Sequence, residues 1–366
     1  MSEAEVGRDG MRGARPGREA QVGRGLRGRD GRRRGGGRGG RGGRGGRGGR
    51  GGRGGRGGRG EKAMVPEAEF TSYYGLPVLK PPVWKAADVA AYLFLGGLAG
   101  AGSTMAAAAQ LTGRPAAARA LKISSLAAIA GSTAALIHDL GRPERFSNML
   151  RVMKPTSPMS VGSWVLAAYG PAAGGAAVLD AAGILPRLGG AATAAAAALG
   201  PVVTVYTAVL IADTAVPAWH EGRRELPFVF AGSATTAAAG MALVAAPVRE
   251  TGPMRTAAVA GALLELAAAK LLERRAGLAA EPYKRGKAGR FMRAGEILSA
   301  AGTAGSVLPA GRGRAAAALS GAALLAGSAC TRFGIFHAGI QSAEDPKYTV
   351  VPQRERVDAR GTEATA

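Results

Sequence analysis

The chain has one cysteine, Cys330, and three histidines, His138, His220 and His337, among its 366 residues. A single thiol excludes a disulfide framework, and it excludes an iron–sulfur cluster held by this chain alone, because a cluster needs about four thiolates. Haem of the b type needs axial histidines inside membrane spans, whereas each histidine here lies at the edge of an apolar run. No group of His, Cys, Asp and Glu has metal-ligand spacing. We therefore expect no haem, no cluster and no metal site.

Charge is missing from long stretches in the middle of the chain. Gly189–Ile211 and Gly232–Val248 contain no charged residue at all. A soluble helix needs a polar face, and a helix that is apolar all round is a membrane span or the centre of a large core. About eight runs approach the roughly 20 residues that a bilayer core requires. They are Ala86–Leu111, Ala116–Ile137, Ser160–Ala182, Leu188–Val216, Pro227–Ala246, Arg255–Leu272, Phe291–Leu308 and Ala315–Ile335.

A soluble, Ala-rich helical bundle is the alternative, because alanine inserts into membranes only marginally. Eight helices without a polar face cannot all be central in one soluble core, however. Small residues also let membrane helices approach closely, as in the GLAGAG segment at Gly97–Gly102. We therefore expect an all-α integral membrane protein whose polytopic domain occupies residues 86–336.

The first 62 residues are basic and carry much of the net charge of +23. Repeats of Gly-Gly-Arg run from Gly37 to Gly60 without any apolar side chain, so we expect a disordered Arg/Gly-rich tail. Such a tail could bind RNA through arginine charge and stacking, or it could simply be solvated near anionic lipid headgroups. It lacks interleaved aromatic residues, which favours the second interpretation, and nucleic acid is not an expected partner.

Two flanking segments and the distribution of basic loops predict how the domain sits in a membrane. Residues 63–85 are rich in proline and aromatic residues, which suits a membrane–water interface, and residues 337–366 form a polar C-terminal tail. An even number of spans puts both termini on one side. The loops expected there, residues 139–159, 213–226 and 273–290, contain more Arg and Lys than the opposite loops. The positive-inside rule therefore predicts a multi-pass plasma-membrane protein with cytoplasmic termini.

Five residues in or near the spans could exchange protons or bind a polar ligand. Glu265 lies near the middle of the sixth run, and an intramembrane charge tends to face a polar path or a partner. The others could be structural: acids at span ends can cap helices or be solvated, tyrosines pack, and loop histidines are often hydrated. Glu265 itself could pair with Lys270 or with a basic residue of another helix. The candidates are Asp139, Tyr206, Asp213, His220 and Glu265.

Three blocks of sequence carry a family resemblance. They are TSYYGLPVLKPPVW with AYLFLGGLAGAGS (Thr71–Trp84 and Ala91–Ser103), HDLGRPERFSNMLRVMKPTSPMSVGSW (His138–Trp164) and YTAVLIADTAVPAWHEGRRELPFVFAGSA (Tyr206–Ala234). Together they resemble the NrfD-type family of polysulfide reductase membrane subunits, which are quinone-interacting anchors. The resemblance implies two four-helix bundles, no haem and a quinone site near one membrane face. It also implies a ferredoxin-like iron–sulfur subunit and a molybdopterin catalytic subunit as partners.

These inferences predict an integral membrane anchor subunit that exchanges electrons and protons with the quinone pool, with menaquinone as the expected quinone. The chain alone would not act on the final substrate of such a complex. Arginine-rich loops could dock the partner by forking onto its carboxylates. The docking candidates are Arg142, Arg145, Arg151, Lys154, Arg223 and Arg224. The alternative class is a secondary transporter with Glu265 and Glu296 as coupling carboxylates.

Overall fold

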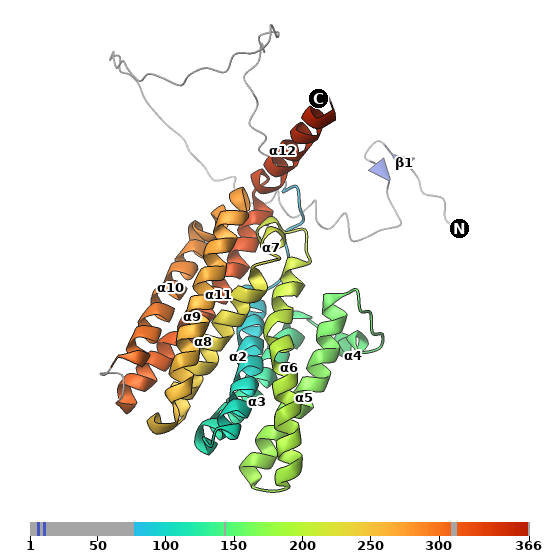
Figure 1. Cartoon of the computed structure of the whole chain (residues 1–366). Coiled ribbons are helices and arrows are strands. Elements are labelled where there is room, and N and C mark those ends of the chain that lie inside the picture. The colour runs from blue at the N-terminus through green and yellow to red at the C-terminus, as the bar shows by residue number, and fades with distance from the viewer. Residues whose placement is uncertain (1–5, 8–9, 12–76, 143, 309–312, 365–366) are drawn as a thin grey trace, which may run out of the picture. The chain divides into compact units, whose positions relative to one another are not determined.

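The computed structural model describes residues 6–7, 10–11, 77–142, 144–308 and 313–364, in two compact units (Figure 1). In the first unit, β1 (Val6–Gly7) pairs antiparallel with β2 (Gly10–Met11). The rest of the predicted Arg/Gly-rich tail lies outside the described residues, and so do residues 63–76 of the predicted interfacial segment. All described elements of the second unit are helices, which confirms the all-α prediction for that unit.

In the described part of the second unit, eight helices have 20 residues or more, and each overlaps one of the eight predicted runs. Prolines stand in the first or second position of five of them, where a missing N–H removes no helical hydrogen bond. The sequence thus marks where these helices begin. They are α2 (Ala86–Leu111), α3 (Pro115–Asp139), α5 (Pro158–Ala182), α6 (Pro186–Ala212), α8 (Leu226–Ala245), α9 (Gly252–Arg275), α10 (Gly286–Val307) and α11 (Arg314–Glu344).

Six of these helices are long and apolar enough to cross a membrane: α2, α3, α5, α6, α8 and α11. The other two are long enough but contain more charge. In α10, Lys287, Arg290, Arg293 and Glu296 all lie in the first half of the helix. In α9, charges lie at both ends, with Glu265 between them. Length and composition therefore establish a multi-pass membrane protein with six candidate spans in the described part of the chain.

The long helices pack as two groups of four. In the first bundle, α2 contacts α3 and α6, and α5 contacts both α3 and α6. In the second bundle, α8 contacts α9 and α11, and α10 contacts both α9 and α11. The two bundles meet where α2 and α6 pack against α8, and where α2 also packs against α11. Glycines allow close crossings, because a Cβ on Gly200 of α6 would lie 2.5 Å from the carbonyl oxygen of Gly100 on α2.

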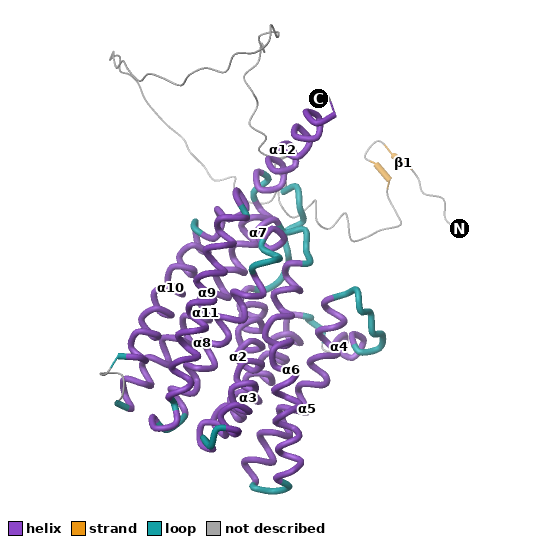
Figure 2. Tube along the Cα trace, viewed as in Figure 1, coloured by secondary structure: helices purple, strands orange, loops and turns teal. Residues whose placement is uncertain are grey.

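Short helices cover one end of the second bundle, at the end where α12 emerges (Figure 2). There α7 (Pro217–Glu221), η2 (Gly277–Tyr283) and α12 (Lys347–Ala364) contact one another and, in part, α11. The last long helix runs to Glu344, beyond the predicted end at Ile335, because Phe336, Ala338 and Ala343 are buried under this cover. Two other short helices complete the unit, α4 (Glu144–Met149) and η1 (Val248–Glu250).

Candidate functional sites

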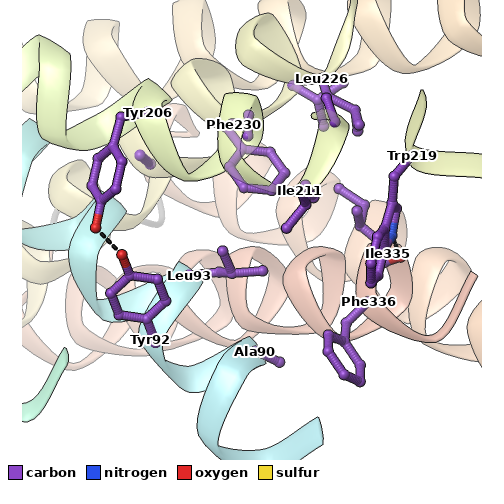
Figure 3. Close-up of a cluster of buried hydrophobic side chains, with 14 of the residues drawn as sticks. Ala90, Tyr92, Leu93, Tyr206, Ile211, Trp219, Leu226, Phe230, Ile335 and Phe336 are labelled. Atoms are coloured by element: carbon purple, nitrogen blue, oxygen red, sulfur yellow. Dashed lines mark hydrogen bonds between the residues drawn. The ribbon is translucent and has the colours of Figure 1, made fainter. Parts of the chain in front are cut away.

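Two tyrosine hydroxyls meet inside the first bundle. Tyr92 of α2 is 4% exposed, Tyr206 of α6 is 7% exposed, and their hydroxyls are hydrogen-bonded to each other (Figure 3). The rings lie edge to face with centroids 6.4 Å apart. Gly162 of α5 makes room for the Tyr206 ring, because a Cβ at that position would overlap it. The sequence predicts Tyr206 as a candidate but misses Tyr92, which is 114 residues away along the chain.

Asp139 lies at the C-terminal end of α3 and contacts the beginning of α2. Its Oδ1 accepts a hydrogen bond of 3.1 Å from the backbone N–H of Lys85, the N-cap residue of α2. The neighbouring His138 pairs through Nδ1 with Oδ2 of Asp88, 2.8 Å away. Lys85 and Tyr92 are about two helical turns apart. Asp139 and Tyr206 therefore contact the same N-terminal part of α2, and Asp139 also has the capping role that the sequence left open.

Asp213 and His220 lie together in a different place. Asp213 is the C-cap of α6, His220 lies in α7, and both are exposed. They line an open groove of about 860 Å³ beneath α12, whose walls also include Glu221, Tyr348 and Arg356. Neither Asp139 nor Tyr206 lines this groove. The five candidates therefore occupy three separate sites rather than one.

Glu265 occupies the third site, inside the second bundle. It is 9% exposed, and its Oε1 accepts a 2.8 Å hydrogen bond from the hydroxyl of Thr331 on α11. It does not pair with Lys270, whose ammonium instead lies 3.6 Å from Glu273. Glu296, the second carboxylate of the transporter alternative, is exposed on α10. The two carboxylates of that alternative therefore have different environments.

The basic loop residues are largely on the surface. Side chains of five of the six docking candidates are exposed, and Arg223 also donates a 3.2 Å hydrogen bond to the carbonyl oxygen of His220. The side chain of the sixth, Arg145 in α4, lies outside the described residues. The exposed ones are Arg142, Arg151, Lys154, Arg223 and Arg224.

Sequence reasoning also misses Trp219, which anchors the covered end of the second bundle. Its indole is fully buried and lies beside Ile335 (Figure 3), to whose carbonyl oxygen it donates a 2.8 Å hydrogen bond. The indole also stacks on Trp84, with the ring centroids 5.8 Å apart. Gly339 leaves space for the ring, because a Cβ there would overlap it. Tyr283 of η2 donates to the carbonyl oxygen of Ala218, which fixes α7 from the other side. In the sequence, the role of Trp219 is indicated only by its position next to the candidate His220.

Comparison with protein families assigns the chain to a family. Residues 70–344, most of the chain, match the model of the polysulfide reductase family of NrfD type. The chain belongs to this family. None of the curated proteins compared with it matches. Membership of the polysulfide reductase family agrees with the six candidate spans, and it makes the chain a member of a group of membrane subunits of oxidoreductase complexes.

The match extends over both bundles and includes all five candidate residues, while the part of the groove wall formed by α12 lies beyond it. It begins near the interfacial segment and ends with α11, so α12 and the basic N-terminal tail lie outside it. Among the described residues, no three His, Cys, Asp or Glu side chains lie close enough to hold a metal ion. Family membership gives the class of the protein, while the chemistry of each site depends on the residues that form it.

Proposed function

We propose that the chain is the quinone-reactive membrane subunit of an oxidoreductase complex. It would exchange electrons with a ferredoxin-like iron–sulfur subunit, which in turn serves a molybdopterin catalytic subunit. A bound quinone, which we expect to be menaquinone, would carry two electrons and two protons. The residues of this chain would bind the carbonyl groups of the quinone and move protons to or from them. The chain by itself would not act on the substrate of the catalytic partner.

The tyrosine pair in the first bundle carries this proposal. A phenol has one proton to donate and can accept hydrogen bonds as well. When Tyr92 and Tyr206 bond to each other, only one of their two protons is used. The second proton remains available to a carbonyl oxygen, which is what binding of a quinone requires. Both hydroxyls are buried, so a hydrogen bond to a ligand would form with little competition from water.

Access to this pair from the lipid side is supported by exposed apolar side chains near the beginning of α5. Met153, Met159 and Trp164 are 60%, 50% and 39% exposed, and Gly162 in the same stretch contacts the Tyr206 ring. A hydrophobic isoprenoid tail would suit such a surface. Asp139, which ends α3 and caps α2, is partly exposed and supplies a carboxylate between this region and solvent. We propose it as the proton-exchanging group.

Partner docking is proposed for the end where α7, η2 and α12 lie. Exposed arginines follow α3 and α6, and guanidinium groups pair well with the carboxylates of a partner protein. The groove that contains Asp213 and His220 opens at this end, which supports a docking role for these two residues. The excess of basic residues in these loops favours a cytoplasmic location in the plasma membrane. Reporter fusions at Ala366 and at Gly183, in the loop between α5 and α6, should then label opposite sides.

We also propose that α9 and α10 cross the membrane, which gives eight spans. Between Arg255 and Lys270, the single ionisable residue of α9 is Glu265, which is buried, while Leu263 and Leu264 are exposed. The charges of α10 are confined to its first half, where long side chains can reach the interface. Its second half exposes apolar side chains such as Ile297.

Quinone-coupled turnover of the intact complex tests the proposed function. Tyr206→Phe should lower it by one to two orders of magnitude, because the substitution removes a hydroxyl that the proton transfer needs. Asp139→Asn should also lower turnover, and both complexes should still assemble. Arg142→Ala should instead weaken assembly. Tyr169→Phe is the matched control: Tyr169 is fully buried in the same bundle, and its hydroxyl binds Ser103 and the carbonyl oxygen of Ala99.

A loss of turnover confined to Tyr206→Phe and Asp139→Asn supports the site. Full quinone activity of both variants in an assembled complex would move the quinone site elsewhere, with Glu265 as the next candidate. Equal losses for Tyr206→Phe and Tyr169→Phe would indicate a packing defect rather than lost chemistry.

A further inference from the structure

Arg332 of α11 is a fully buried charge with incomplete hydrogen bonding. It is 0% exposed, its guanidinium lies 3.7 Å above the centre of the Phe230 ring, and Nη2 donates a 2.9 Å hydrogen bond to the carbonyl oxygen of Phe230. Nε and Nη1 have no hydrogen-bond partner among the residues that the structure describes. The ring and one carbonyl oxygen cannot replace the hydration of a guanidinium, because five N–H groups need acceptors.

Glu265 has the complementary deficit. Its Oε1 is bonded to Thr331, but its buried Oε2 accepts no hydrogen bond of normal length within the described part of the chain, although the Ser233 hydroxyl is near enough to interact with the carboxylate. Glu265 and Arg332 are near enough for their charges to interact, yet no free atom of either group bonds directly to the other. Two unpaired donors and one unpaired acceptor of opposite charge thus occupy the same region of the second bundle. Groups left in this way inside a protein are costly unless something joins them.

The site lies where the two bundles meet. A Cβ on Gly97 of α2 would lie 3.2 Å from Nη2 of Arg332, so the guanidinium reaches the contact between the bundles. Glu265 lies behind α8, where a Cβ on Gly232 would lie 2.5 Å from its backbone nitrogen. On α8 and α11, the hydroxyls of Ser233 and Ser328 bond to each other at 2.9 Å. The surroundings are therefore polar enough to hold a small hydrogen-bonding molecule.

We propose that ordered water binds between Glu265 and Arg332 and converts them into a water-bridged ion pair at the junction of the bundles. A water molecule accepts from Nε–H or Nη1–H and donates to Oε2, so it joins a free donor to the free acceptor. A metal cation fits less well, because the guanidinium already supplies the positive charge. The inference concerns the second bundle and does not depend on the proposed quinone site in the first.

A double-substitution cycle on the full chain in lipid nanodiscs tests the ion pair. Glu265→Leu and Arg332→Met each leave one buried charge without its counter-charge, and each should lower the melting temperature by roughly 10 °C. Glu265→Leu combined with Arg332→Met removes both charges and should recover at least half of that loss. Glu296→Gln, which removes an exposed carboxylate from α10, is the matched control and should shift the melting temperature by less than about 2 °C.

Radiolytic hydroxyl-radical labelling tests the water. Radicals formed on bound water modify adjacent side chains, so buried Phe230 should be labelled more than Phe336, which is equally buried. The double variant should lose the excess. Three results would overturn the proposal: additive losses in the cycle, equal labelling of the two phenylalanines, or a melting temperature that changes when choline replaces sodium and potassium. The last result would indicate a bound cation instead of water.

Discussion

A close contact between two helices of the second bundle, α8 and α11, gives a quantitative prediction. At the crossing of α8 and α11, a Cβ on Gly240 would lie 2.6 Å from the carbonyl oxygen of Gly321 and 2.9 Å from the Cβ of Leu324. Normal contact for such atoms begins at 3.4 Å. Because the nearest atom belongs to the backbone, it cannot turn aside, and the helices must separate by several tenths of an ångström.

Gly240→Ala should therefore destabilise the protein by about 1–3 kcal/mol, the usual range for overpacking. For a chain of this size, that corresponds to a fall in melting temperature of roughly 3–10 °C. The assay heats aliquots of the purified protein in one detergent and measures the folded fraction by size-exclusion chromatography. Gly190→Ala on α6 is the control, because a Cβ there meets no atom within 4 Å.

Gly321→Ala should have a similar effect, since its Cβ would meet the carbonyl oxygen of Gly240. The double variant should lose less than the sum of the two, because one separation of the helices relieves both contacts. If the Gly240→Ala and Gly190→Ala variants have the same melting temperature, then α8 and α11 are not in contact at Gly240 and Gly321. The packing of the second bundle described above would then be incorrect.

Two further predictions concern charges at the two ends of the second unit. At the covered end, desolvation alone would raise the pKa of Glu281, but the hydrogen bond and charge of Lys347 outweigh it and lower the pKa. A carboxyl with a lowered pKa stabilises the fold above its unfolded value and loses this contribution as the pH falls through the folded value. The protection of α12 amides against hydrogen exchange, corrected for the intrinsic pH dependence of exchange, should therefore fall on acidification, and Glu281→Gln should remove most of that change in protection. At the other end, Asp180 pairs with Lys122, which is 4% exposed, and with Arg119, which is 56% exposed. Lys122→Met should destabilise by roughly 1–3 kcal/mol and Arg119→Ala by less than about 1 kcal/mol in thermal unfolding; equal effects would contradict the burial of Lys122.

Local signals in the sequence were enough to predict the eight long helices. Runs without charge, of a length set by the bilayer, and prolines at helix starts are properties of neighbouring residues, and each can be read without knowing the fold. The end of α11 was less predictable. Its last residues look polar by composition, and they are helical because Trp219, from a distant segment, packs on Gly339.

Individual candidate residues could also be chosen from the sequence, because ionisable groups inside apolar runs are rare and costly. Their grouping could not. Asp139, Tyr206, Asp213 and Glu265 lie in three separate places, and nothing in their spacing indicates which helix each one meets. Asp139 and Tyr206 are connected through α2, which contacts both.

The sequence by itself determined that this chain is a multi-pass, all-helical member of the polysulfide reductase family, because composition and local motifs carry that information. Only the tertiary structure decided that Tyr92 is the partner of Tyr206. It also decided that the charges of Arg332 and Glu265 interact without a direct hydrogen bond between the two side chains. Both pairs join residues that are far apart in the chain: Tyr92 and Tyr206 are separated by 114 positions. Contacts of this kind depend on how helices pack, and packing is set by the combined fit of many small residues rather than by any local pattern.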